Sequence, residues 1–367
     1  AILAFPTDED AIVDLHVWTR KTVEHADAAS DEIRQALDEA GFDRPVRRIV
    51  VMVSGPSVLA PSGQTLYFTF RPGPDGFREQ KLYRGMHPMM AKRLELWRLR
   101  HFFVNRLPAA EDVYLLHGVA RDNPKDERLF AIAEVRDATP ARDAEGRVVG
   151  LPQLERMAME ALTAIRQAQA TRPPAGRLQW NRVLLYVRPA LYVAREDLEQ
   201  VARRLAEEAE GLGLQKMVVR ARIPDESGEL RDTIVRVALA SGHGPSLEFR
   251  EPTADPIQPL TEYAQKVVRM RQRGLSYPYE LIRMLTPGRD GVQSDLPPGA
   301  FVEHDLDADG KLVPVDRPYG RNTANVVVGV VSNFTSRYPE GMRRVIILGD
   351  PSKEVGSLAE PECRRIL

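Results

Sequence analysis

The strongest constraint on the fold is that two distant parts of the sequence repeat one order of elements. Residues 39–107 predict a helix end, a β-branched strand over 46–53, a turn, an alternating strand and a closing helix. Residues 210–274 predict the same order, with the equivalent first strand over 214–222. Identity between the two parts is slight, but the turns fall at matching places. We therefore expect two related domains.

The second copy is preceded by elements that complete it. The sequence predicts adjacent strands over 113–120 and 128–137, a helix over 151–170, a strand over 181–188 and a helix over 195–211. The first of these helices has charge on one side and an apolar stripe on the other: Leu154, Met157, Met159, Leu162 and Ile165. Such a stripe is typical of a helix packed on a sheet. The predicted fold class is α+β, with two related domains, each of one β-sheet flanked by long helices.

Three domains are expected. Residues 1–107 are interpreted as the C-terminal part of a first α/β domain, because AILAFP is typical of a strand end and a helix is expected at once after it. Residues 108–255 form the second such domain. A cluster of prolines between 252 and 259 interrupts both helices and strands, and therefore marks the start of a third domain, residues 256–367.

Composition excludes several classes of protein. The 367 residues have a net charge of −1, which gives no reason to expect a nucleic acid or an anionic membrane as partner. The single cysteine, Cys363, excludes an internal disulfide framework and fits a reducing compartment. No apolar run approaches the roughly 20 residues of a membrane helix, and the N-terminal residues are too acidic for a signal peptide. A cytoplasmic location is expected.

Residues 305–316, DLDADGKLVPVD, match most of a calcium-binding EF-hand loop. The match fails at the last position, where Asp316 replaces the usual bidentate Glu, and Pro314 lies inside the loop. We interpret the segment as an Asp-Gly hairpin whose Asp side chains cap the turn. No metal site is expected.

The first 255 residues show no recognisable active site. Basic residues between Lys92 and Arg106 could hold phosphates, but their spacing scatters them around a helix, which favours a solvated face. His87 and His243 are single histidines, for which turn or packing roles are the default. Ser54 lacks the glycine of a nucleophile elbow. No catalytic residue is therefore assigned.

The last 70 residues are more informative. The hairpin followed by LVPVDRPYGRNTANVVVGVVSN, then YPEGMRRVIILGD, then VGSLAEPE and a helix, resembles the opening of the carboxyltransferase region of single-chain, multidomain biotin-dependent acetyl-CoA carboxylases. Upstream stretches from 81–120 and 260–285 resemble the C-terminal part of the central region of the same enzymes. The resemblance implies a scaffold made of paired α/β domains, followed by the truncated start of a crotonase-like carboxyltransferase lobe.

The resemblance also implies where chemistry occurs. Biotin, ATP and Mg would act in other domains of the same chain, the biotin carboxylase, biotin carrier and carboxyltransferase, and no cofactor is expected in this segment. The glycine-rich oxyanion turn and the biotin-side residues would follow Leu367. The complete enzyme would act on acyl-CoA and form a homo-oligomer through its carboxyltransferase.

One possible substrate contact remains, the turn GDPSKEVGSL. The family has a lysine near this Gly-Ser that lies close to the CoA phosphates, and here Lys353, Gly356 and Ser357 are the candidates, although a gapless match puts Glu354 at the lysine position. A cation suits phosphate, and Gly356 allows a ligand close to the backbone. The alternative for Lys353 is a solvated side chain. Two other functions stay open, a free-standing regulatory or binding module of a carboxylase and a crotonase-type hydratase or hydrolase.

Overall fold

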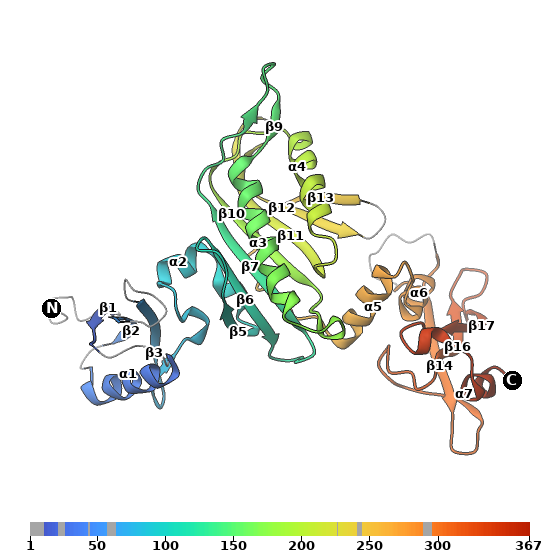
Figure 1. Ribbon diagram of the computed structural model, residues 1–367. Helices are drawn as coiled ribbons and strands as arrows, with labels where there is room; N and C mark the ends of the chain where they lie inside the picture. Colours follow the sequence, from blue (N-terminus) through green and yellow to red (C-terminus); the bar gives the residue numbers. More distant parts are fainter. Residues whose placement is uncertain are drawn as a thin grey trace. The chain divides into compact units, whose positions relative to one another are not determined.

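The computed structural model describes residues 11–20, 26–42, 45–56, 64–225, 227–240, 244–288 and 296–367. The chain forms two compact units, one that ends at Pro259 and one that begins at Leu260 (Figure 1). Among the described residues, no helix has both the length and the apolar character needed to cross a membrane.

The first unit begins with a four-stranded sheet of order β1-β2-β3-β4. Its strands are β1 (Ala11–Trp18), β2 (Val46–Gly55), β3 (Gln64–Gly73) and β4 (Gly76–Glu79), and α1 (Ala26–Ala40) connects the first two. β1 runs parallel to β2, and the later pairs are antiparallel. Ile49, Val51, Phe68 and Phe70 form the centre of its core.

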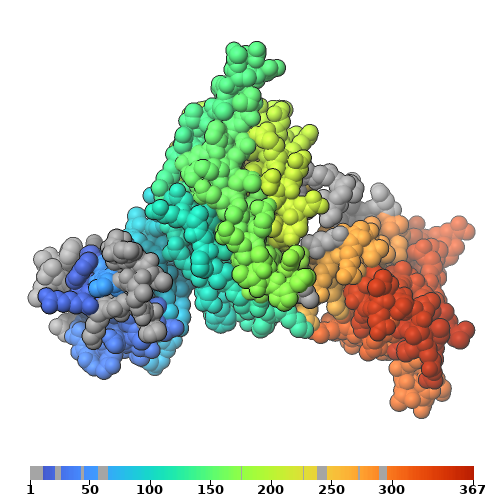
Figure 2. Space-filling view, in the orientation of Figure 1, coloured from blue at the N-terminus to red at the C-terminus, as the bar shows by residue number. Residues whose placement is uncertain are grey.

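A seven-stranded sheet follows, of order β13-β12-β11-β10-β7-β6-β5. Two helices, α3 and α4, lie side by side over one face of this sheet, and the small hairpin β8–β9 projects beyond them at the top of both views (Figures 1 and 2). The elements are β5 (Phe102–Leu107), β6 (Val113–Ala120), β7 (Glu127–Val135), β8 (Ala141–Arg142), β9 (Val148–Gly150), α3 (Pro152–Ala170), β10 (Asn181–Ala190), α4 (Arg195–Glu208), β11 (Leu214–Pro224), β12 (Leu230–Ala240) and β13 (Gly244–Arg250).

The predicted helix over 151–170 is confirmed as α3, and its apolar stripe faces the sheet. Leu154, Met157, Leu162 and Ile165 are buried, and Met159 is partly buried against the same core. This core lies between the two helices and one face of the sheet, and burial of apolar area drives its formation. The α+β fold class is confirmed.

The predicted duplication is confirmed by topology. The series β1-α1-β2-β3-β4 and β10-α4-β11-β12-β13 have the same strand order, with the first two strands parallel and the next pair antiparallel. Even the register irregularity after the first paired residue recurs, between Ala11 and Ile12 and between Asn181 and Arg182. The strands at 46–53 and 214–222 therefore occupy equivalent places.

Two buried amide side chains hold the start of the second copy together. Asn181 accepts the backbone N–H of Leu129 at 2.7 Å and donates to the carbonyls of Leu178 and Leu212. Gln169, in the last turn of α3, exchanges hydrogen bonds with the backbone of Leu178. These amides satisfy backbone groups that burial would otherwise leave unpaired.

The closing helix predicted over residues 86–107 is wrong. The segment contains a one-turn helix α2 (Pro88–Arg93), a 3-10 turn (Leu96–Leu99) and strand β5. Glu95 has φ +50°, which interrupts the helical backbone, and β5 pairs with β6 at the sheet edge. Pairing with a neighbouring strand overrides a helical apolar pattern here. Because β5 and β6 are paired in one sheet, the domain boundary predicted after residue 107 would separate two paired strands.

The helix expected directly after AILAFP is also wrong. Residues 1–6 lie outside the described residues, and Ala11–Trp18 form strand β1, paired along its whole length with β2. The helix of this copy begins only at Ala26. The short apolar alternation in AIVDLHVW is a strand pattern, and the parallel partner β2 lies too far along the sequence for local propensity to indicate it.

The second unit contains α5 (Glu262–Gln272), α6 (Pro278–Leu285) and an antiparallel sheet of order β15-β14-β16-β17. The strands are β14 (Gly299–Leu306), β15 (Leu312–Pro314), β16 (Val326–Asn333) and β17 (Met342–Gly349), and α7 (Glu360–Ile366) follows. Tyr277, Tyr279 and Ile282 pack with Val327 in its core. The crotonase-like assignment of this unit stays a prediction.

We expect Leu162→Ala to destabilise the first unit. Leu162 is fully buried, and a buried Leu→Ala change costs about 2 to 5 kcal/mol because it loses apolar contacts and leaves a cavity. Denaturant unfolding followed by tryptophan fluorescence measures the loss, since all three tryptophans lie in this unit. Arg156→Ala, on the exposed face of α3, is the control and should change stability by less than about 0.5 kcal/mol. An equal loss of stability in both variants would contradict the assignment of Leu162 to the buried face of α3 and of Arg156 to its exposed face.

Candidate functional site

The residues predicted to contact CoA lie in the turn between β17 and α7. Lys353 donates from Nζ to the carbonyl oxygen of Asn322 at 2.5 Å, and its backbone N–H donates to the carbonyl of Asp350. Asn322 in turn donates to the buried carboxylate of Asp350 at 2.9 Å. Lys353 is half-buried and bonded to backbone, so the alternative of a freely solvated lysine is not what the structure shows.

The backbone of this turn is strained. Glu354, Val355 and Gly356 have φ values of +41°, +59° and +73°. Positive φ is natural for Gly356 but costly for Val355, whose β-branched side chain crowds the backbone in the left-handed region. The side chains of Glu354 and Val355 are exposed, so burial does not explain the conformation. Strain of this kind is concentrated at functional sites, which supports the choice of this turn as the candidate site.

In the second unit, two buried carboxylates on β14 are bonded to partly buried arginines. Arg317 donates to Asp305 at 2.6 Å and to Glu303 at 2.8 Å. Arg365, from α7, donates to the other oxygen of Asp305 at 2.7 Å. Burial alone would raise the pKa of Asp305, but hydrogen bonds from Thr323, Arg317 and Arg365 lower it to about 2. The network therefore joins α7 to strand β14.

The acidic segment forms the predicted hairpin. β14 and β15 pair antiparallel, with Asp305 opposite Val313. Asp307 caps the turn by accepting the backbone N–H groups of Asp309 and Lys311. Because the carboxylate of Asp305 is already bonded to two arginines, the first ligand of the EF-hand pattern has a structural role. The hairpin interpretation is confirmed.

The basic residues between Lys92 and Arg106 do not form one phosphate-binding face. Arg93 contacts Glu134, Arg98 pairs with Glu95, and Arg106 stacks over Tyr114 at 4.8 Å. Their partners lie on different elements, because the single predicted helix is replaced by α2, a turn and β5. These cations are therefore used within the fold.

His87 and Ser54 have hydrogen-bond partners within the fold. His87 caps α2, where its Nδ1 accepts the backbone N–H of Met89, and His243 lies outside the described residues. Ser54 hydrogen-bonds to Thr65 and to Nε2 of His16 at 2.9 Å. This serine–histidine pair was not predicted from the sequence, because the two residues are 38 positions apart and meet only through the parallel pairing of β1 and β2.

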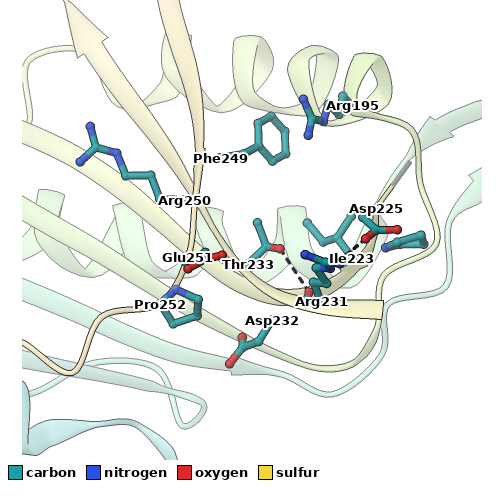
Figure 3. Close-up of a pocket in the computed structure, with 11 residues that line it drawn as sticks. Arg195, Ile223, Asp225, Arg231, Asp232, Thr233, Phe249, Arg250, Glu251 and Pro252 are labelled. Atoms are coloured by element: carbon teal, nitrogen blue, oxygen red, sulfur yellow. Dashed lines mark hydrogen bonds and ion pairs between the residues drawn. The ribbon is translucent and has the colours of Figure 1, made fainter. Parts of the chain in front are cut away.

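An open cleft of about 370 Å³ lies at the ends of β11, β12 and β13. Figure 3 shows Arg195 beside the ring of Phe249, and an ion pair between Asp225 and Arg231. The guanidinium carbon of Arg195 lies 4.6 Å from the centre of the Phe249 ring. Acidic and basic residues alternate around this cleft, so it has no marked charge preference. Asp225 pairs with Arg231 inside the cleft, and Asp232 and Arg250 pair with Arg220 and Glu248 outside it. The cleft is not assigned a ligand.

The chain is similar to known proteins. Residues 8–237 match the family model described as acetyl-CoA carboxylase, central region. The chain is similar to acetyl-CoA carboxylase of Saccharomyces cerevisiae, with 22% identity over 371 aligned positions, which cover 90% of this chain and 16% of the yeast protein. It is also similar to the crystal structure of the central domain of yeast acetyl-CoA carboxylase, with 19% identity, a TM-score of 0.46, and 68% of this chain and 38% of that chain covered.

We expect Arg365→Met to raise the pKa of Asp305 towards the ordinary range, because the change removes one of the two guanidinium groups that stabilise the carboxylate. A pH titration of the Asp305 side-chain carboxyl by carbon-13 NMR measures the shift from its value of about 2. Arg364→Met is the control, since Arg364 pairs with Glu360 on the exposed side of α7. An unchanged Asp305 titration in Arg365→Met would mean that α7 does not dock on β14 in solution.

Proposed function

The chain belongs to the acetyl-CoA carboxylase central-region family, and on that basis we propose that its first unit is a non-catalytic scaffold within a biotin-dependent acyl-CoA carboxylase. The chain spans about 16% of the length of the yeast relative that it matches. The scaffold would hold the biotin carboxylase and carboxyltransferase domains of the same chain at working distance. The observation that carries this proposal is the family match, which covers the first copy of the duplicated fold and the second copy as far as residue 237, within β12.

The use of buried charge in the first unit supports a structural role. Asp126 and Arg128 are fully buried and paired with each other. Glu134 is bonded to Arg93 and Arg188. Burial alone would raise the pKa of Glu134, but its arginine partners lower it. A catalytic acid or base at neutral pH needs a pKa moved towards the working pH, and the pKa of Glu134 moves the other way. These groups stabilise the fold.

The second unit is proposed to begin the carboxyltransferase. In the complete enzyme, carboxybiotin would give its carboxylate to the enolate of an acyl-CoA, and backbone donors of a crotonase-like lobe would stabilise the enolate. Biotin, ATP and Mg would act in other domains, and the complete enzyme would form a homo-oligomer through its carboxyltransferase. Lys353, Gly356 and Ser357 would form one wall of the CoA site, because the strained turn exposes its backbone beside a lysine.

This assignment predicts that the 367-residue chain alone does not transfer carboxyl groups. The assay is decarboxylation of malonyl-CoA in the presence of free biotin, run on this chain and on a chain extended through the whole carboxyltransferase. Loss of a single oxyanion donor already costs roughly a hundred- to a thousandfold in rate, so only the extended chain should be active. Activity in the short chain would overturn the scaffold role. Absence of activity in both chains would contradict the carboxyltransferase assignment.

A second prediction concerns Lys353 in the extended chain. Lys353→Met should raise the KM for acyl-CoA up to about fivefold with kcat unchanged, because a lysine–phosphate contact near the surface is worth about 1 kcal/mol or less. The KM for an acyl-pantetheine, which lacks the nucleotide phosphates, should not change. Lys311→Met, at the exposed tip of the β14–β15 hairpin, is the control. An equal rise for both substrates would show that Lys353 acts only by holding Asn322.

A further inference from the structure

Four basic residues form a row across four adjacent strands of the seven-stranded sheet, on the face opposite α3 and α4. Arg182 on β10 lies directly opposite Lys216 on β11. Arg236 on β12 lies opposite Val218, one side-chain position further along the same face. Arg128 on β7 lies two residues before Phe130, which pairs with Arg182. Alternation along each strand places all four side chains on one face.

The two ends of this row have carboxylate partners. Arg128 is bonded to Asp126 through two hydrogen bonds, both groups being fully buried. Arg236 donates to Glu248 on β13 at 3.2 Å, and Arg250 shares the same carboxylate. Asp126 therefore balances the charge of Arg128, whereas Glu248 is shared by two arginines and balances only one of their two positive charges.

The two cations in the middle of the row, Arg182 and Lys216, have no carboxylate bonded to them in the described part of the chain, although the negative charge of Asp126 acts on Arg182. Arg182 is 92% buried, since 8% of its surface is exposed, and its Nε donates to the neutral amide of Gln215 at 2.9 Å. Within the described part of the chain, neither Arg182 nor Lys216 forms an ion pair. The Nε of Arg236 is buried without a hydrogen-bond partner among the described residues. Cations that lie directly opposite one another destabilise a sheet, and their partial burial adds to the cost.

The fold itself does not require these cations. In the first copy of the duplicated unit, the register places Ile12 opposite Arg48, and Thr69 opposite Val50. Ile12, Arg48 and Thr69 are thus the equivalents of Arg182, Lys216 and Arg236. In the first copy only one of these three positions, Arg48, is charged. In the second copy all three are charged, although the strand order is the same. The charges of the second copy therefore serve something other than strand pairing.

We propose that Arg182, Lys216 and Arg236 bind a small tetrahedral oxyanion, a phosphate group or its equivalent. A doubly charged oxyanion supplies the missing negative charge and accepts several hydrogen bonds, which suits two guanidinium groups and one ammonium. Arg182 forms the buried floor of the site. Lys216 and Arg236 are only partly buried and form its rim, open to an entering anion.

The site predicts a pH dependence that a simple basic surface does not show. Burial, and then the neighbouring arginines, lower the pKa of Lys216 to about 7. The charged groups that act on Lys216 are Arg182 on β10, Arg236 on β12, Arg250 on β13 and Arg98 of the 3-10 turn. The carboxylates of the same region are bonded to arginines: Asp126 to Arg128, Glu248 to Arg236 and Arg250, and Glu95 to Arg98. A bound anion favours the ammonium form of Lys216. Below about pH 7 Lys216 is already charged, and the affinity for the anion is highest. Above about pH 7 Lys216 is neutral in the free protein and must gain a proton when the anion binds. The affinity therefore falls by up to about tenfold per pH unit.

The probe is sulfate, which does not titrate between pH 6 and 8. Calorimetric titration of the 367-residue chain should show binding that weakens as the pH rises through this range. Lys216→Arg keeps the charge and should bind sulfate with no such pH dependence. Lys216→Met should bind at least tenfold more weakly, and should melt at a higher temperature than the parent chain without sulfate, because the repulsion is relieved.

Arg222→Met is the matched control, since Arg222 lies exposed on the same strand and face as Lys216 and should leave sulfate binding unchanged. Sulfate also stabilises proteins by exclusion from their surface, so melting temperatures are compared between variants at equal sulfate concentration. Binding of phosphate at pH 6, but not of acetate, supports a tetrahedral anion. The proposal is overturned if sulfate binds Lys216→Met as tightly as the parent chain, if Lys216→Arg keeps the pH dependence, or if acetate binds as well as sulfate.

Discussion

The buried amides of Gln169 and Asn181 hold together the elements on which the seven-stranded sheet depends. Asn181 starts β10 and bonds the backbone at the start of β7 and just before β11, while Gln169 ties the end of α3 to the same region. Gly213, with φ +61°, fits here because a Cβ would meet the carbonyl oxygen of Leu178 at 2.4 Å. Every polar group in this cluster has a defined partner, so the cluster specifies one arrangement of helix and strands, which apolar packing alone does not.

The duplicated unit shows how one topology serves two environments. Both copies bury an apolar face under a crossover helix, and that face is determined by β-branched and aromatic residues that recur at every second position. The opposite faces differ. In the second copy part of that face is covered by the 3-10 turn and its leucines, and the rest carries arginine and lysine. The shared strand order therefore does not imply shared chemistry, because the face that is free of the core can change without loss of the fold.

The candidate site in the second unit depends on contacts between segments distant in sequence. The turn after β17 is held by Asn322 and Asp350, and α7 is held by Asp305, which lies 60 residues before Arg365. Turn residues such as Gly349, Pro351 and Gly356 indicated where this site lies. The bond from Lys353 to the backbone carbonyl of Asn322 was not predictable, since it joins residues 31 positions apart. The positive φ of Val355 was not predictable either, because a β-branched residue gives no local signal for that conformation.

The sequence by itself determined the α+β class, the positions of most helices and strands, the acidic hairpin and the duplication, because periodicity and turn residues are local signals. It failed where pairing decided the structure: residues 102–107 have a helical apolar pattern but complete a sheet beside β6, and Ala11–Trp18 pair with a strand that lies beyond a helix. Only the tertiary structure placed Arg182 opposite Lys216 and His16 beside Ser54. Strand register across a crossover is set by the packing of the whole sheet and helix, and no short stretch of sequence contains that information.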